Sequence, residues 1–156
     1  MTILYQARVG RYDLLKPIQF LAKRITRWDE ACDRRLHRLM CYLFTTQDYR
    51  MMGWIGDLPK NLSLHLFCDA DFAGCPYTMR STSGAHSEVQ GPNSGFPWGA
   101  GAAGQTSVAH STPEAELSSL DQGIRKRGET VICIWQTIMK QFHEDDPQWK
   151  AVVNVH

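Results

Sequence analysis

The residues best suited to chemistry are acidic side chains in two short stretches, DAD at positions 69–71 and EAE at positions 114–116. Residues 62–68 alternate leucine or cysteine with polar and aromatic side chains, which predicts a strand that ends at Asp69. A carboxylate fixed by a strand but open to water suits a metal ligand or a general base, because it need not be desolvated. Aspartate and glycine are also common in turns, and DADFAG by itself favours a plain turn.

The second acidic stretch follows a strong helix start signal. Ser111 and Glu114 form a capping box, and Pro113 falls in the first turn of the predicted helix. Acidic side chains at a helix N-terminus interact favourably with the helix dipole, and this is the simpler interpretation of Glu114. Glu116 remains open to both interpretations, dipole partner or site residue.

Composition bounds the class of protein. The chain has 156 residues, of which 43% are hydrophobic, enough for one globular domain or a small domain with a piece of another. Its apolar runs are short and its N-terminus lacks a secretory pattern, so we expect no membrane partner and an intracellular location, cytoplasmic or nuclear. Five cysteines without a CxxC pair are expected to be reduced and mostly buried, with no disulfide framework or zinc site.

Charge divides the chain into two parts. Residues 1–60 contain eleven Lys and Arg against six Asp and Glu, whereas residues 61–156 contain six against ten. A basic part beside an acidic part fits phosphate binding next to a carboxylate metal site, although solvated surface charge produces the same division by chance.

The basic part is predicted to be helical. Residues 13–25 carry an apolar stripe that ends at Ile25, and Thr26 with Asp29 gives a start signal for a helix over 28–43. The other side of this second helix carries Arg34, Arg35 and Arg38, which suits contact with a nucleic-acid backbone and equally suits a solvated face. Residues 45–60 are predicted to be a connector.

The acidic part is predicted to be mixed. Poor strands are expected over 85–89 and 96–100, another strand over 105–110, a turn at 143–147 and a strand over 149–156. A core helix is expected over 130–142, with an apolar stripe of Val131, Trp135, Ile138, Met139 and Phe142. GAAG at 101–104 lacks the following lysine of a phosphate-binding loop.

Four ordered motifs carry a family resemblance. DADFAG, STSG at 81–84, GPNSGFPW at 91–98, and Gln105 followed by VAHSTPEAEL resemble the RNase H region of Copia-type retrotransposon polyproteins. The upstream segments LYQARVGRYDLL, ITRWDEACDRRLHRLMCYL and GWIGD look like the end of the reverse transcriptase with its thumb-like connection. The resemblance implies a mixed α/β fold: a helical thumb and connection segment over 1–60, then an RNase H-like domain over 61–156, truncated at its C-terminus. Such a domain has antiparallel strands followed by helices that alternate with parallel strands.

The resemblance also implies an activity. RNase H domains hydrolyse the RNA strand of RNA–DNA hybrids with two divalent metals, Mg²⁺ or Mn²⁺, held by four carboxylates. Asp69 and Glu116 match two of these catalytic metal ligands, with Asp71 and Glu114 supporting at most. The candidate nucleic-acid contacts are Gln105 and the three arginines of the basic helix side, Arg34, Arg35 and Arg38. The implied partners are the hybrid or another nucleic acid and the rest of the polyprotein, namely the reverse transcriptase and the downstream RNase H residues.

Two departures from the family pattern count against activity. The third catalytic aspartate should follow AVVNVH, where the sequence stops, and the fourth carboxylate is missing as well. Ala103-Gly104-Gln105 also stands where the family usually has Ser-Lys-Lys-Gln, so two phosphate-contacting lysines are lost. We therefore expect an RNase H-type fragment that is inactive as an isolated chain. The alternatives are a non-catalytic nucleic-acid-binding remnant of a decayed retroelement and a poorly folded element without activity.

Overall fold

The chain forms two compact units. The computed structural model describes residues 2–143 and 150–156, and the units are Met1–Met51 and Met52–His156. The sequence analysis divided the chain at 60/61. The connector groups with the second compact unit because it bonds to a hairpin of that unit: Trp54 pairs with Gly95, and the Asp57 carboxylate accepts a hydrogen bond from the Ser94 hydroxyl at 2.6 Å.

The first unit is helical, as predicted. It contains α1 (Thr2–Val9), η1 (Tyr12–Leu14), α2 (Leu15–Ala22), η2 (Ile25–Arg27) and α3 (Glu30–Thr45). The helix predicted over 13–25 is thus shorter, and its stripe is buried only as far as Leu21, since Ile25 is 69% exposed. Arg11 connects distant parts of the unit. Its guanidinium donates hydrogen bonds to the carbonyl of Thr46 at 2.9 Å and to the carboxylate of Asp13 at 2.8 Å.

The start of α3 differs from its predicted cap. Asp29, not Thr26, is the residue that caps the helix, and its Oδ1 accepts a hydrogen bond from the backbone N–H of Cys32 at 2.8 Å. Asp29 can do so because its extended backbone points the carboxylate at the free N–H groups of the first turn. The buried side of α3 carries Cys32 and Leu39.

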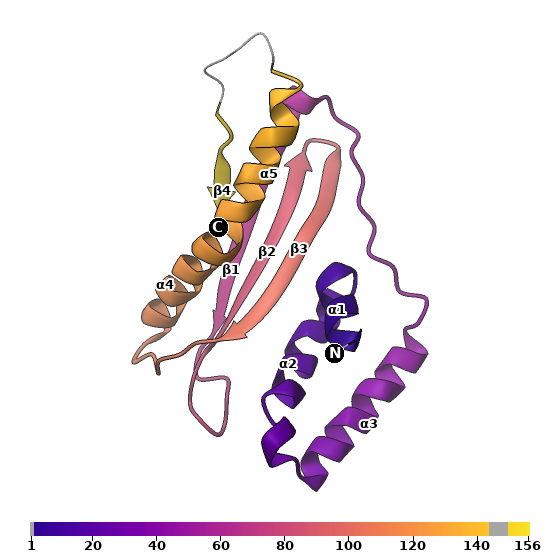
Figure 1. The fold of residues 1–156 in the computed structure, drawn as a ribbon, viewed down its shortest axis with the longest axis vertical. Helices are drawn as coiled ribbons and strands as arrows, with labels where there is room; N and C mark the ends of the chain where they lie inside the picture. The colour runs from indigo at the N-terminus through magenta and orange to yellow at the C-terminus, as the bar shows by residue number, and fades with distance from the viewer. Residues whose placement is uncertain (1, 144–149) are drawn as a thin grey trace. The chain divides into compact units, whose positions relative to one another are not determined.

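The second unit is built on a mixed four-stranded sheet in the order β3-β2-β1-β4 (Figure 1). Its strands are β1 (Ser63–Asp71), β2 (Thr82–Gly91), β3 (Ser94–Gly104) and β4 (Val153–Val155), and the connector before β1 contains η3 (Pro59–Asn61). The first three strands pair antiparallel, whereas β4 is parallel to β1, with Leu64 opposite Val153.

Strand prediction was most accurate for β1. The strands expected over 85–89 and 96–100 are the middle parts of two much longer strands, and the strand expected over 105–110 is wrong, because β3 ends at Gly104. Glycine, alanine and serine have weak strand propensity, but β2 is paired along both edges and its pairing overrides that propensity.

Helices cover one face of the sheet. α4 (Thr112–Gly123), the π-helical turn η4 (Ile124–Gly128) and α5 (Glu129–Lys140) follow one another and connect β3 to β4. The core contains Leu64, Val89, Val131, Trp135 and Met139. The predicted stripe of α5 is therefore right at these last three positions and wrong at Ile138 and Phe142, which are exposed.

Several further sequence predictions can be compared with the structure. The mixed α/β class is confirmed. The turn predicted at 143–147 and the start of the last predicted strand fall largely outside the described residues. All five cysteines are free thiols, but only Cys32 is buried, so the expectation of mostly buried thiols is wrong. Within the described ranges, no helix has both the length and the apolar content needed to cross a membrane.

Candidate functional site

The two candidate catalytic residues lie on elements that cross each other. α4 faces the sheet with Ala115, Ser119 and Gly123, which are all buried. The Ser119 hydroxyl donates a hydrogen bond to the backbone carbonyl of Asp69 at 2.5 Å, and Gly123 lies against the sulfur of Cys68. The C-terminal half of β1 is therefore fixed to α4 at the position of Asp69.

The side chains of Asp69 and Glu116 differ in their surroundings. Asp69 is exposed and Glu116 is half-buried. Because side chains alternate along a strand, the Asp69 carboxylate lies on the face opposite Ala70, which packs with Ala115 of α4. The structure thus joins α4 to Asp69 through the Ser119 hydroxyl and the backbone carbonyl of Asp69. The pairing of their carboxylates around one metal stays a prediction.

The neighbouring acidic residues have local structural roles. The Asp71 carboxylate folds over the turn after β1, where a Cβ on Gly74 would lie 2.0 Å from its Oδ2. Glu114 accepts a hydrogen bond from the backbone N–H of His110 at 2.7 Å, and the hydroxyl of Ser111 accepts one from the N–H of Glu114 at 3.4 Å. The helix-start role of Glu114 is therefore confirmed. Its carboxylate bonds the N–H of His110, one residue before the N-cap Ser111, whereas in an ideal capping box it bonds the N–H of the N-cap itself.

Gln105 does not lie where a nucleic-acid contact would need it. Its side chain belongs to the interior, with 3% of the residue exposed. Its Nε2 donates to the carbonyl of Ala115 at 2.8 Å and to the hydroxyl of Ser83 at 3.1 Å. The prediction that Gln105 binds nucleic acid is corrected: this amide ties the first turn of α4 to β2.

The predicted basic side of α3 is exposed at all three positions, Arg34, Arg35 and Arg38. Arg34 forms an ion pair with Glu30 at 2.6 Å, and the guanidinium of Arg35 lies 4.5 Å from the ring centre of Phe20. Arg38 makes no ion pair within the described part of the chain. These side chains can meet a phosphate backbone without first leaving a buried site.

Two features were not found from the sequence as candidate sites. One is a shallow cavity of about 190 Å³ in the first unit, lined by both Arg11 and Arg50. The other is a row of rings on the face of the sheet that carries Asp69: Phe67 lies 4.8 Å from His156 and 6.2 Å from His86, centre to centre. The alternation of His65, Phe67 and Asp69 in β1 was the available signal for this row.

Burial raises the pKa of the Cys68 thiol, which disfavours a thiolate beside α4. In the described ranges 2–143 and 150–156, no three side chains of His, Cys, Asp or Glu gather closely enough to hold a metal ion.

Comparison with known proteins adds no family assignment to this geometry. No protein-family model, no curated protein and no solved structure matches the chain.

Proposed function

We propose that the chain is part of a Copia-type retroelement polyprotein, with residues 61–156 forming the N-terminal part of an RNase H-type domain and residues 1–60 the end of the reverse transcriptase. The complete domain would hydrolyse the RNA strand of RNA–DNA hybrids. The observation that carries this proposal is the connectivity of the second unit. Three antiparallel strands are followed by helices and then by β4, parallel to β1, which is the order that the sequence resemblance implies.

The positions of the motifs support the same proposal. DADFAG ends β1, STSG opens β2, GPNSGFPW forms the β2–β3 turn with the first part of β3, and EAE lies in the first turns of α4. DADFAG, STSG and EAE therefore fall at element boundaries where β1 and α4 cross, whereas GPNSGFPW lies at the other end of the sheet, where Gln90 is opposite Ser63. Loop and element ends are where binding and catalytic residues concentrate.

Asp69 and Glu116 would be ligands of Mg²⁺ or Mn²⁺, because such ions bind carboxylate oxygens. Bound metals would activate a water and stabilise the leaving oxygen of the RNA strand. The donor set is short of the four carboxylates that this chemistry uses, and no three ligands come together in the described residues. We therefore expect that the 156-residue chain does not cut an RNA–DNA hybrid by itself.

A cleavage assay tests this proposal. The 156-residue chain is compared with a longer chain that adds the two missing carboxylates, each with and without Asp69→Asn, on a labelled hybrid in Mg²⁺. Asp121→Asn is a matched control, because Asp121 is also exposed in the second unit but pairs with Arg125. Only the longer chain with Asp69 and the longer Asp121→Asn control should cut.

Cutting by the short chain that depends on Asp69 would show that the catalytic set lies within these residues. An inactive longer chain, or one that is indifferent to Asp69→Asn, would contradict the RNase H proposal.

A second candidate function is nucleic-acid binding without cleavage. The exposed basic side of α3 favours it, above all Arg38, which makes no ion pair with a carboxylate of residues 2–143 or 150–156. Binding through phosphate contacts weakens steeply as salt rises. Salt-dependent binding of a hybrid by the chain, with no cleavage by any longer version, would support this function over the first.

A further inference from the structure

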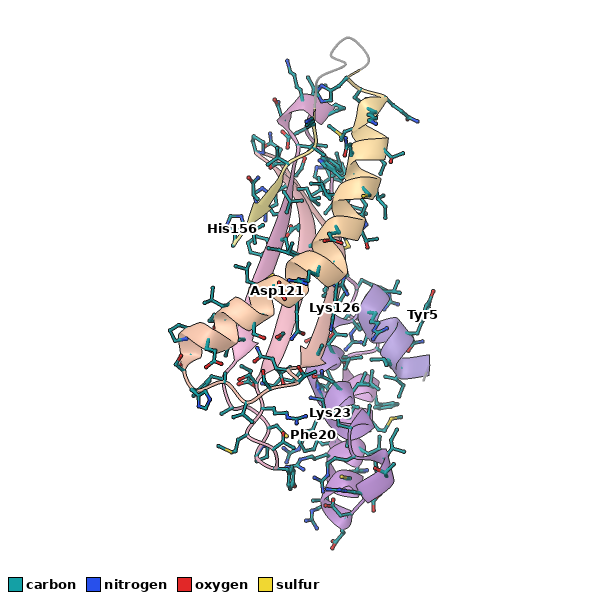
Figure 2. All side chains as sticks on the ribbon, turned by 60° about the vertical axis from the view of Figure 1, so that its left-hand side comes forward. Tyr5, Phe20, Lys23, Asp121, Lys126 and His156 are labelled. Atoms are coloured by element: carbon teal, nitrogen blue, oxygen red, sulfur yellow. The ribbon has the colours of Figure 1, made fainter. Side chains whose placement is uncertain are left out.

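Two histidine rings join β4 to β1. Nδ1 of His65 lies 2.8 Å from Nε2 of His156, and the two rings are nearly parallel, at 9°. His156 follows the last residue of β4 and is labelled in Figure 2. It also forms two backbone hydrogen bonds with β1. Its N–H donates to the carbonyl of Leu66 at 2.9 Å, and its carbonyl accepts from the N–H of Cys68 at 3.0 Å. The ring contact thus lies at the point where β4 is attached.

The outer nitrogen of His65 has partners of its own. The Ser63 hydroxyl lies 2.8 Å from Nε2 of His65 and 3.4 Å from the carbonyl of Gln90, and Nδ2 of Asn154 lies 3.4 Å from the same Nε2. The ring hydrogen bond between His65 and His156 needs a single hydrogen between Nδ1 of His65 and Nε2 of His156, which either ring can supply as the donor.

We propose that His65 and His156 form a pH-sensitive latch, which holds β4 against β1 while a single hydrogen lies between Nδ1 of His65 and Nε2 of His156 and releases β4 in acid. One added proton is tolerated, because an outer ring nitrogen can take it while the hydrogen bond between the facing nitrogens stays. A second proton leaves both facing nitrogens protonated, which places two N–H groups and two positive charges against each other. The ring hydrogen bond is then lost and the contact becomes repulsive.

The attachment of β4 is weak enough for this change to matter. The strand has three residues, of which Val153 packs against the core and Val155 is 43% exposed. Parallel pairing of so short a strand contributes few hydrogen bonds. A repulsive contact at its end therefore removes a large part of what holds it.

The charged groups around the pair set the direction of the pH effect. Glu88 of β2 lies opposite His65 in the register, and it contacts His86 at 3.4 Å. Asp69 lies further along the same face of β1. Burial and the neighbouring His156 lower the pKa of His65 from its ordinary value near 6.5, and the charge of Glu88 offsets this in part. A lowered pKa in the folded state means that stability is complete above about pH 6.5 and is lost as pH falls through the lowered pKa.

Hydrogen exchange and histidine NMR on the whole chain test the latch. Between pH 7.5 and pH 5, the protection factors of the Cys68 and His156 amides, corrected for intrinsic exchange rates, should fall at least about fivefold, the factor for one ordinary hydrogen bond. The amide of Val89, between β1 and β3, should keep its protection. The ring signals of His65 should titrate with the same midpoint as the amide protection.

Non-titrating variants isolate the pair. His65→Gln and His156→Gln should each remove the pH dependence at Cys68, whereas His110→Gln, an exposed histidine elsewhere in the unit, should leave it unchanged. A chain carrying an added Gly-Ser-Gly after His156 should behave like the original, because a terminal carboxyl titrates below this range. The proposal is overturned if protection at Cys68 is constant with pH, if it falls together with that of Val89, if it still falls in both glutamine variants, or if the added residues abolish the effect.

Discussion

Replacing Gly123 with alanine tests how closely α4 lies on β1 at the candidate site. In an ordinary helix interior this change stabilises by about 1 kcal/mol, because alanine is the better helix former. Here a Cβ on Gly123 would lie 2.3 Å from Sγ of Cys68, whereas ordinary contact starts at 3.4 Å. The sulfur or the helix must therefore move by roughly an ångström, and Ser119 already holds the helix to the Asp69 carbonyl.

The magnitude follows from two opposing contributions. Overpacking of this kind costs about 1–3 kcal/mol, against the gain of about 1 kcal/mol in helix propensity. Gly123→Ala should therefore lower the free energy of unfolding by about 1 kcal/mol. In a Cys68→Ala background the sulfur is gone and the Cβ atoms of Ala85 and of residue 68 lie at an ordinary 3.7 Å, so the same change should raise stability by about 1 kcal/mol.

Urea unfolding followed by circular dichroism measures the four members of this double-mutant cycle, and hydrogen exchange in β1 peptides locates the effect. The expected coupling between the two positions is about 2 kcal/mol. Gly128→Ala is the control, because the atom nearest to its Cβ would be Cδ2 of Leu66 at 3.3 Å, not an atom of Cys68, and this contact is much less close than the 2.3 Å at Gly123. If Gly123→Ala stabilises equally with and without the cysteine, the close approach of α4 to Cys68 is refuted.

Three further changes probe other contacts. Ser111→Ala removes the cap of α4 and should lower the free energy of unfolding, measured by urea titration, by about 1 kcal/mol. An unchanged free energy of unfolding would show that α4 does not need this cap. The Ser94 hydroxyl and the N–H groups of Asn93 lower the pKa of Asp57. The ionised Asp57 therefore stabilises the fold above about pH 3.9, and this stabilisation is lost as pH falls through the lowered pKa. Hydrogen exchange in the β2–β3 turn should lose protection in acid, and this loss should be absent in Asp57→Asn. Arg38→Ala should weaken hybrid binding and reduce the salt slope by about 0.9, whereas Lys126→Ala, which removes an exposed charge from the other unit, should not.

The sequence by itself determined the elements whose signals are local. The alternation of residues 62–68 located β1, because one buried face imposes a period of two. Ser111 and Pro113 located the start of α4, because an N-cap acts only on the N–H groups of its own first turn. The exposed arginines of α3 followed in the same way, once Cys32 and Leu39 were assigned to its buried side.

Only the tertiary structure decided the features that depend on a distant partner. β2 and β3 are long because each is paired with a neighbour, which their glycines and serines do not reveal. Gln105 was expected at a nucleic-acid surface, but β2 and α4 close around it and satisfy its amide N–H groups from both sides. The contact of His65 with His156 joins residues 91 positions apart, and strand pairing alone brings them together. Local patterns fix period and caps, whereas burial, register and ring contacts depend on which segments the folded chain places side by side.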